Sequence, residues 1–140
     1  MLARATRSVY LIFGLTGVFA ATMVARVPQI RDTLHLNATA FRLVHGEADL
    51  LPSLIVDRYG DYLVMQTLSQ GMDRLAPTMV RLLVELTGAQ GILARNDPKV
   101  RRLEGLEQTV EVLHGEVPPS IDVHELGIRY SVDPWHGQKT

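Results

Sequence analysis

The sequence predicts an α+β fold in which a mostly antiparallel sheet carries one long packed helix, preceded by an apolar N-terminal helix. Short runs of strand-forming residues alternate with turn residues from position 42 onward. Only one later stretch, 72–86, has the spacing of an amphipathic helix. The chain has 140 residues, 46% of them hydrophobic and 21% charged, which is typical of about one folded domain.

The N-terminal segment 1–37 is predicted to be an apolar helical leader and linker. Residues 8–25 carry no charge, with Arg4 and Arg7 before them and Arg26 after them. About 18 apolar residues is the lower limit for crossing a bilayer, so a membrane helix is one interpretation. A secretory signal cleaved near Ala20 is another, and a buried helix or a mistranslated leader is the third.

A hairpin is predicted at the start of the following block. Residues 42–45 and 54–58 are apolar runs typical of strands. Tyr59-Gly60-Asp61 supplies turn residues before a third strand at 62–68, which is therefore expected to pair with the second.

The long helix is predicted over residues 72–86. Its apolar side chains recur at steps of three and four residues, and Gly88 provides the C-terminal stop. Pro77 lies in the first part of this stretch, so a start near Ala76 is the alternative.

The C-terminal part of the block is predicted to contain four more strands. Asp97 and Pro98 open a short helical turn through Leu103, because Asp is a good cap and Pro suits the first helical position. Pro118 and Pro119 interrupt the strand ladder. The predicted strands are 91–95, 108–113, 121–125 and 128–132, the last two forming a hairpin.

Charge and cysteine content limit the possible functions. Residues 1–40 have a net charge of +3 and residues 41–140 a net charge of −4. An acidic block lacks the basic surface that grips nucleic acid, so any RNA contact must be local or shared. The absence of cysteine excludes disulfides, thiolate zinc sites and a thiol nucleophile in this chain.

Several phrases in this block occur together in one enzyme family. They are RLVHGEAD at 42–49, LP at 51–52, IVDRYGD at 55–61, RND at 95–97, VRRLEGL at 100–106, GEVPP at 115–119 and WHGQKT at 135–140. In this order the block resembles the central domain of class I S-adenosylmethionine-dependent ribosomal RNA methyltransferases. That family methylates carbon five of cytosine in large-subunit ribosomal RNA.

The resemblance implies a division of the chain and a cytoplasmic location. Residues 38–134 correspond to an α+β connector between an RNA-binding PUA domain and a Rossmann-like catalytic domain, and residues 135–140 to the start of that catalytic domain. Residues 1–37 are unlike a PUA domain. The chain is therefore expected to be an inactive fragment, with no catalytic residue and no bound S-adenosylmethionine, which is the cofactor of the full-length family.

Three residues are placed beside the cofactor pocket by the resemblance alone. Gln138, Lys139 and Thr140 stand where the family enters its catalytic domain. The alternative is that they form a frayed terminus.

Five residues are candidates for contact with ribosomal RNA. Arg58 and Tyr59 place a charge beside a stacking aromatic, although such a pair also closes hairpins. Lys99, Arg101 and Arg102, with Arg95 nearby, form the basic cluster of the acidic block and could meet phosphate. A solvated ion-pair face with neighbouring glutamates is the alternative.

Metal binding and acid–base chemistry are not indicated. The histidines are scattered without the close spacing of ligands, so no metal site is expected. Glu47 and Asp49 could form a carboxylate pair, but their position in a turn beside Gly46 favours loop capping.

The leader supports a second hypothesis of a different class. Residues 10–36 resemble the first helix and following loop of a major facilitator transporter, so a membrane-anchored protein with a transporter-like first helix is the alternative function. Membrane association through residues 8–25 would follow if the leader is authentic. A small binding module with an unrelated partner is the third possibility.

Overall fold

The computed structural model describes residues 38–125 and 127–137. The described residues belong to one of the two units into which the chain divides, residues 36–140. The apolar helix predicted at 8–25, with its membrane and transporter interpretations, lies outside the described residues. Within 38–125 and 127–137, no helix is long and apolar enough to cross a membrane.

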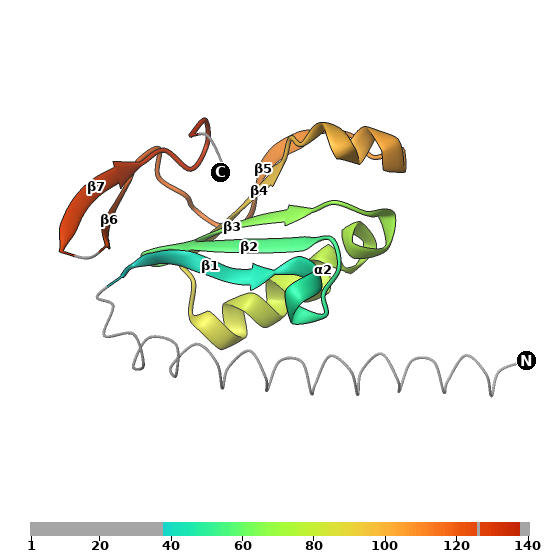
Figure 1. The fold of residues 1–140 in the computed structure, drawn as a ribbon. Coiled ribbons are helices and arrows are strands. Elements are labelled where there is room, and N and C mark those ends of the chain that lie inside the picture. The colour runs from blue at the N-terminus through green and yellow to red at the C-terminus, as the bar shows by residue number, and fades with distance from the viewer. Residues whose placement is uncertain (1–37, 126, 138–140) are drawn as a thin grey trace, which may run out of the picture. The chain divides into compact units, whose positions relative to one another are not determined.

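A five-stranded sheet forms the body of the described unit (Figure 1). Its spatial order is β1-β2-β3-β4-β5, and every neighbouring pair is antiparallel except β3 with β4. The predicted α+β fold with a mostly antiparallel sheet is therefore confirmed, whereas the parallel pair was not foreseen. The strands are β1 (Ala40–His45), β2 (Leu54–Tyr59), β3 (Tyr62–Thr67), β4 (Gly91–Asn96) and β5 (Thr109–Gly115).

The predicted hairpin between β2 and β3 is confirmed. Tyr59 pairs with Tyr62, which leaves Gly60 and Asp61 as the two turn residues. Gly60 has φ +58°, a left-handed conformation that glycine adopts without steric cost. The backbone N–H of Gly60 also donates to the carbonyl of Thr39 at 2.7 Å, so the turn is tied to the segment that leads into β1.

The long helix α2 (Gln70–Thr87) connects the two parallel strands, as a parallel pair requires a crossover. It ends at Gly88 as predicted, in a left-handed cap with φ +64°. The alternative start near Ala76 is wrong, because Pro77 lies inside the helix. Ser69 sets the true start: its hydroxyl accepts from the N–H of Met72 at 3.4 Å, which satisfies an otherwise orphaned donor.

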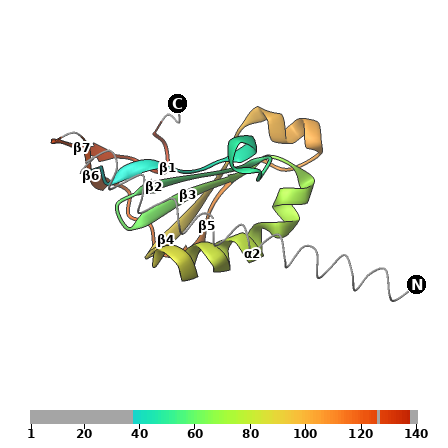
Figure 2. The ribbon, with the colours of Figure 1, turned by 60° about the horizontal axis from the view of Figure 1, so that its bottom comes forward.

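Helix α2 lies along one face of the sheet (Figure 2), and buried hydrophobic side chains of both form the core. Thr67 bonds Asp73 of α2, so β3 residues at two-residue steps from Thr67 face the helix. Leu63 and Met65 are such residues, and both are fully buried. They lie beside Ile92 and Ala94 of β4 in the parallel register, and the helix contributes its own buried side chains, Met72, Met79 and Leu83.

Two short helical turns connect the strands. In η1 (Gly46–Asp49), the carboxylate of Asp49 accepts from the N–H of His45 at 2.8 Å, and that of Glu47 from the N–H of Ser53 at 3.3 Å. This confirms loop capping by the two carboxylates. The predicted turn after residue 98 is η2 (Lys99–Glu104), whose cap residue is Pro98 and not Asp97.

A separate two-stranded sheet follows, as predicted, from β6 (Ile121–Glu125) and β7 (Ile128–Val132). An isolated two-stranded ribbon is marginally stable, so it needs further contacts. Thr39 provides them: its N–H donates to the carbonyl of His124 at 2.8 Å, and its hydroxyl accepts from the N–H of His124 at 2.8 Å. Ile121 and Val123 are buried.

The core assignment predicts unequal effects of two leucine truncations. Leu63→Ala should lower the free energy of unfolding by about 2–5 kcal/mol, because Leu63 is 0% exposed and its loss leaves a cavity. Leu103→Ala is the matched control, since Leu103 is 86% exposed and should change stability by less than about 0.5 kcal/mol. Urea denaturation measures both, and equal losses would contradict the assignment.

Candidate functional site

The carboxyl ends of β3 and β4 lie side by side because these two strands are parallel. The N-terminus of α2 begins at the same edge, since α2 follows β3 in the chain. In open α/β sheets this edge of the parallel strands is where ligands usually bind, and the single parallel pair gives the present sheet one such edge. Two buried arginines, Arg95 in β4 and Arg101 in η2, organise the polar groups found there.

Arg101 fills this edge with its own guanidinium. The side chain is buried, the whole residue being 3% exposed, and Nη1 donates to the carbonyl and hydroxyl oxygens of Thr67 and to the carboxylate of Asp73. The Asp73 contact is 2.9 Å, and Nε donates to the carbonyl of Glu107 at 2.8 Å. A phosphate contact by Arg101 is therefore not supported, because an RNA ligand would have to break these bonds.

Asn96 and Gln66 complete the internal network. The side-chain oxygen of Asn96 accepts from the N–H of Thr67 at 2.9 Å, and the side-chain amide of Gln66 donates to the carbonyl of Arg95 at 2.8 Å. Thr67 and Asp73 were not singled out in the sequence, and Asn96 appeared there only within the RND phrase at 95–97. They are separated by up to 29 positions, and only the parallel pairing brings them together.

Competing effects act on the pKa of the Asp73 carboxylate. Partial burial would raise its pKa, but hydrogen bonds from Thr67 and Arg101 and the charge of Arg101 together lower the pKa below 3.8. A lowered pKa means that the folded state prefers the ionised form. Asp73 therefore stabilises the fold above its ordinary pKa, and this contribution is lost as the pH falls.

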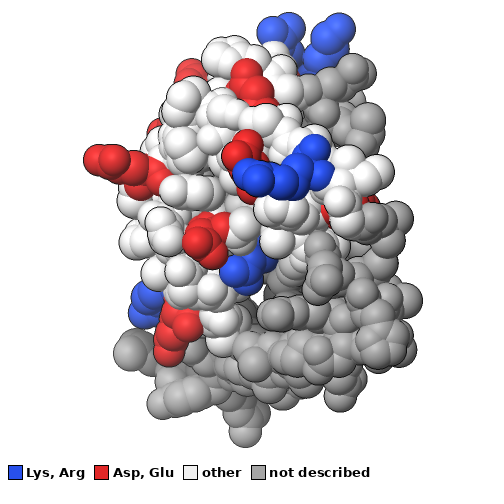
Figure 3. All heavy atoms as spheres, turned by 90° about the vertical axis from the view of Figure 1, so that its left-hand side faces the viewer, with Lys and Arg blue, Asp and Glu red and all other residues white. Residues whose placement is uncertain are grey.

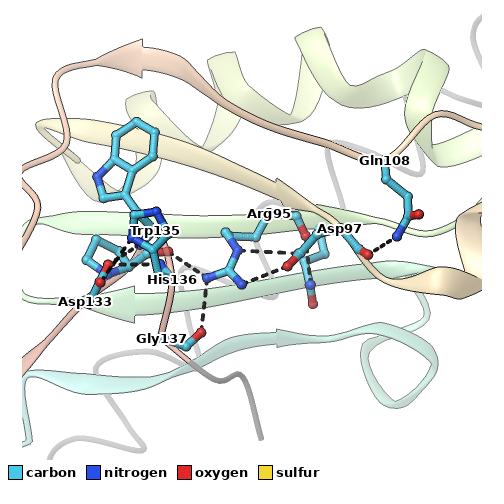
Figure 4. Close-up of polar contacts among 9 residues, drawn as sticks. Arg95, Asp97, Gln108, Asp133, Trp135, His136 and Gly137 are labelled. Carbon is cyan, nitrogen blue, oxygen red and sulfur yellow. Dashed lines mark hydrogen bonds and ion pairs between the residues drawn. The ribbon is translucent and has the colours of Figure 1, made fainter.

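Arg95 is the centre of a second hydrogen-bond cluster, which includes the C-terminal segment of the described chain (Figure 4). The residue is 7% exposed, and its Nη1 donates to the carbonyls of Pro134 at 3.0 Å and Gly137 at 3.2 Å. Its Nη2 and Nε donate to the two carboxylate oxygens of Asp97 at 2.8 and 3.4 Å. The guanidinium thus joins the end of β4 to a turn about 40 residues later.

The turn at residues 133–137 is held by its own contacts as well. One carboxylate oxygen of Asp133 accepts from the N–H groups of Trp135 and His136, at 2.8 and 2.9 Å. The N–H of Gly137 donates to the carbonyl of Asp133 at 3.0 Å. A Cβ on Gly137 would lie 2.3 Å from that carbonyl oxygen, so the turn requires glycine at this position.

The Trp135 indole contacts a neighbouring segment, and the hydrogen bonds of the turn lower the pKa of Asp133. Trp135 Nε1 lies 3.3 Å from the carbonyls of Val117 and Pro118, which links the turn to the segment before β6. The N–H of His136 and then that of Trp135 lower the pKa of Asp133, with a further contribution from the His136 ring at 3.2 Å. The turn therefore favours an ionised Asp133.

The remaining candidates for RNA contact differ in their surroundings. Arg58 Nε donates to the carbonyl of Gly60 at 2.7 Å, which supports the alternative that it closes the hairpin. Tyr59 is half-buried, and burial raises the pKa of its hydroxyl. Lys99 and Arg102 of η2 are exposed. The pocket candidates Gln138, Lys139 and Thr140 lie outside the described residues.

Metal coordination is not apparent in the part of the chain that the structure describes. Residues 38–125 and 127–137 contain no group of three or more His, Asp or Glu side chains that could hold an ion.

Comparison with curated proteins identifies relatives of this block. The chain is 45% identical over 114 residues to ribosomal RNA large subunit methyltransferase I of Aliivibrio fischeri strain MJ11, covering 79% of this chain and 29% of that protein. It is 44% identical over 103 residues to the protein of the same name from Vibrio cholerae strain O395, covering 73% and 26%. The chain is similar to one segment of a methyltransferase.

This similarity confirms the predicted methyltransferase resemblance. The chain spans less than a third of the length of these relatives. A comparison with protein-family models finds no match.

Solved structures of methyltransferases share the fold. A candidate SAM-dependent methyltransferase from Streptococcus mutans aligns with a TM-score of 0.68 at 19% identity, covering 86% of this chain and 31% of that one. A candidate methyltransferase complexed with SAH aligns with a TM-score of 0.66 at 19% identity, covering 87% and 30%. At this identity the likeness establishes the fold only.

The network around Arg101 predicts a pH-dependent role for Asp73. Asp73→Asn should lower the free energy of unfolding at about pH 7 by about 1–2 kcal/mol, since it removes the negative charge that pairs with Arg101 at a partly exposed site. Below about pH 4 the difference should shrink, because the wild-type carboxylate becomes protonated. Denaturant titrations from about pH 7 to pH 3 measure this.

Asp122→Asn is the control for that titration. Asp122 forms an exposed ion pair with Arg129 at 3.5 Å, so its substitution should cost less than about 0.5 kcal/mol. A loss for Asp73→Asn that stays constant down to about pH 3 would contradict the assigned role of the carboxylate.

Proposed function

We propose that residues 38–134 form the connector domain of an S-adenosylmethionine-dependent methyltransferase that acts on large-subunit ribosomal RNA. The observation that carries the proposal is the 45% identity, over 114 residues, to a protein named for that activity. Residues 135–140 would begin the catalytic domain. The substrate implies a cytoplasmic location, and the target would be carbon five of cytosine.

In this proposal the connector does not bind the methyl donor itself. The edge of the sheet where a ligand could bind is occupied by the guanidinium of Arg101, which bonds Thr67 and Asp73. S-adenosylmethionine would be held by the catalytic domain, with Gln138, Lys139 and Thr140 beside its pocket. The chain has no cysteine, so the nucleophile that attacks the pyrimidine ring would also come from outside these residues.

Contact with ribosomal RNA would be local. On the face seen in Figure 3, acidic and basic side chains are interspersed and no broad basic patch is visible among the described residues. Lys99 and Arg102 are exposed on η2 and could each meet one phosphate. Arg58 and Tyr59 would contribute a weaker contact at the β2–β3 turn, because Arg58 is already bonded to Gly60.

Calorimetric titration tests whether S-adenosylmethionine is bound outside this chain. S-adenosylmethionine added to the 140-residue chain should give no binding heat at concentrations up to about 1 mM, a level that corresponds to about −4 kcal/mol of binding free energy. Micromolar binding by this chain would refute the proposal. SAH, which is bound in one of the similar solved structures, provides a second ligand for the same titration.

A charge-matched pair of double variants tests the RNA contact. Lys99→Gln with Arg102→Gln should weaken binding to a single-stranded RNA oligonucleotide and reduce the salt slope by about 1 for each phosphate that is no longer neutralised. The control is Arg74→Gln with Arg81→Gln, which removes the same charge from exposed positions of α2.

Fluorescence anisotropy at several salt concentrations measures both double variants. Selective weakening for the η2 variant supports a local contact, whereas equal weakening for both would show only a general charge effect and would contradict it.

A further inference from the structure

Arg95 connects two parts of the chain that are distant in sequence. It lies in β4, and its Nη1 reaches the carbonyls of Pro134 and Gly137, 39 and 42 positions later. These two carbonyls stand at either end of a four-residue stretch. A single side chain therefore fixes the orientation of that stretch as well as its location.

The chemistry of this contact requires an arginine. A buried cation needs a counter-charge, which Asp97 supplies through two hydrogen bonds to Nε and Nη2. Nη1 then donates to both backbone carbonyls. A lysine presents a single ammonium group on a flexible stem and cannot reproduce this planar arrangement.

The turn that Arg95 holds is also stiff within itself. Asp133 accepts from two N–H groups of the turn, Gly137 approaches the Asp133 carbonyl too closely for any side chain, and the Trp135 indole bonds the segment before β6. A rigid turn fixes the direction in which the backbone leaves it. A flexible turn would leave that direction variable.

We propose that Arg95 is a positioning residue, which fixes the turn at residues 133–137 against the end of β4 and so sets the direction in which the chain leaves Gly137. A consequence for a catalytic domain, whose start this turn would orient, rests on the proposed function. The positioning itself does not, because it depends only on the contacts between β4 and residues 133–137.

Spin-label distances test the positioning directly. The chain has no cysteine, so nitroxides can be attached specifically through Leu103→Cys, an 86% exposed site on η2, and His136→Cys, an exposed side chain in the turn. With Arg95 intact, pulsed electron resonance should give a narrow distance distribution. Arg95→Met should broaden it, and Arg95→Lys, which keeps the charge but carries all its N–H donors on one nitrogen, should give an intermediate width.

Arg42→Met is the matched control. Arg42 also donates to a carboxylate on this sheet, that of Asp57 at 2.7 Å, but this partner lies in β2 and not in the turn. The control should leave the distance distribution narrow. A distribution that is equally broad with and without Arg95, or equally broadened by Arg42→Met, would overturn the proposal.

Two further readouts separate positioning from a general loss of stability. Trp135 is the only tryptophan, so its fluorescence quenching by acrylamide reports the turn, and it should rise in Arg95→Met but not in Arg42→Met. Amide exchange of the Trp135, His136 and Gly137 N–H groups should accelerate about tenfold, equivalent to about 1.4 kcal/mol of protection. Faster exchange spread evenly over β4 and β5 would indicate a purely structural role and overturn the proposal.

These measurements contain neither S-adenosylmethionine nor RNA. A negative result would therefore remove the positioning role of Arg95 and leave the proposed function standing. Conversely, micromolar binding of S-adenosylmethionine would remove the proposed function and leave the contact between Arg95 and the turn intact.

Discussion

The parallel pairing of β3 with β4 is the constraint on which the rest of the described unit depends. Parallel neighbours cannot be joined by a tight turn, so the chain must cross over the sheet, and α2 makes that crossing. The crossing places the start of α2 at the carboxyl ends of both strands. Backbone and side-chain polar groups then meet in a partly buried region, where each of them needs a partner.

Arg101 satisfies that need at the edge of the sheet. Its guanidinium offers several donors in a fixed plane, and Thr67, Asp73 and Glu107 supply the acceptors. The same bonds attach η2 to the end of β3. Because breaking one partner of a buried charge leaves the other unsatisfied, this cluster resists being opened to admit a ligand.

The two buried arginines therefore have different consequences for function. Arg101 fills the carboxyl edge of the parallel pair of β3 and β4 with bonds to Thr67 and Asp73. Under the proposed function, this would suit a domain that leaves catalysis to another. Arg95 instead reaches out of the sheet to the last described turn. Under the proposed function, a connector would use both properties: an interior that does not compete for the cofactor, and an exit point whose geometry is fixed.

The sequence by itself determined the local elements of this protein. Strand and helix periodicity, the Gly88 stop, the Gly60 turn and the β6–β7 hairpin are properties of neighbouring residues, and each was predicted near its observed position. The motif phrases likewise indicated the methyltransferase family that the curated relatives support. The start of α2 had two alternatives in the sequence, because Pro77 disfavours a helix that extends through it. The Ser69 cap and the bond between Thr67 and Asp73 favour the earlier start, which the structure shows.

Only the tertiary structure decided how the charged residues are used. Arg95, Lys99, Arg101 and Arg102 form one basic cluster in the sequence, yet two of them are buried and two are exposed. Each buried arginine has one local partner, Asp97 or Glu107, but it also has partners 28 to 42 positions away, which no local pattern encodes. Burial and hydrogen bonding of a charge depend on which distant acceptors the fold brings within about 3 Å, so they follow from the sheet topology and not from the spacing of residues.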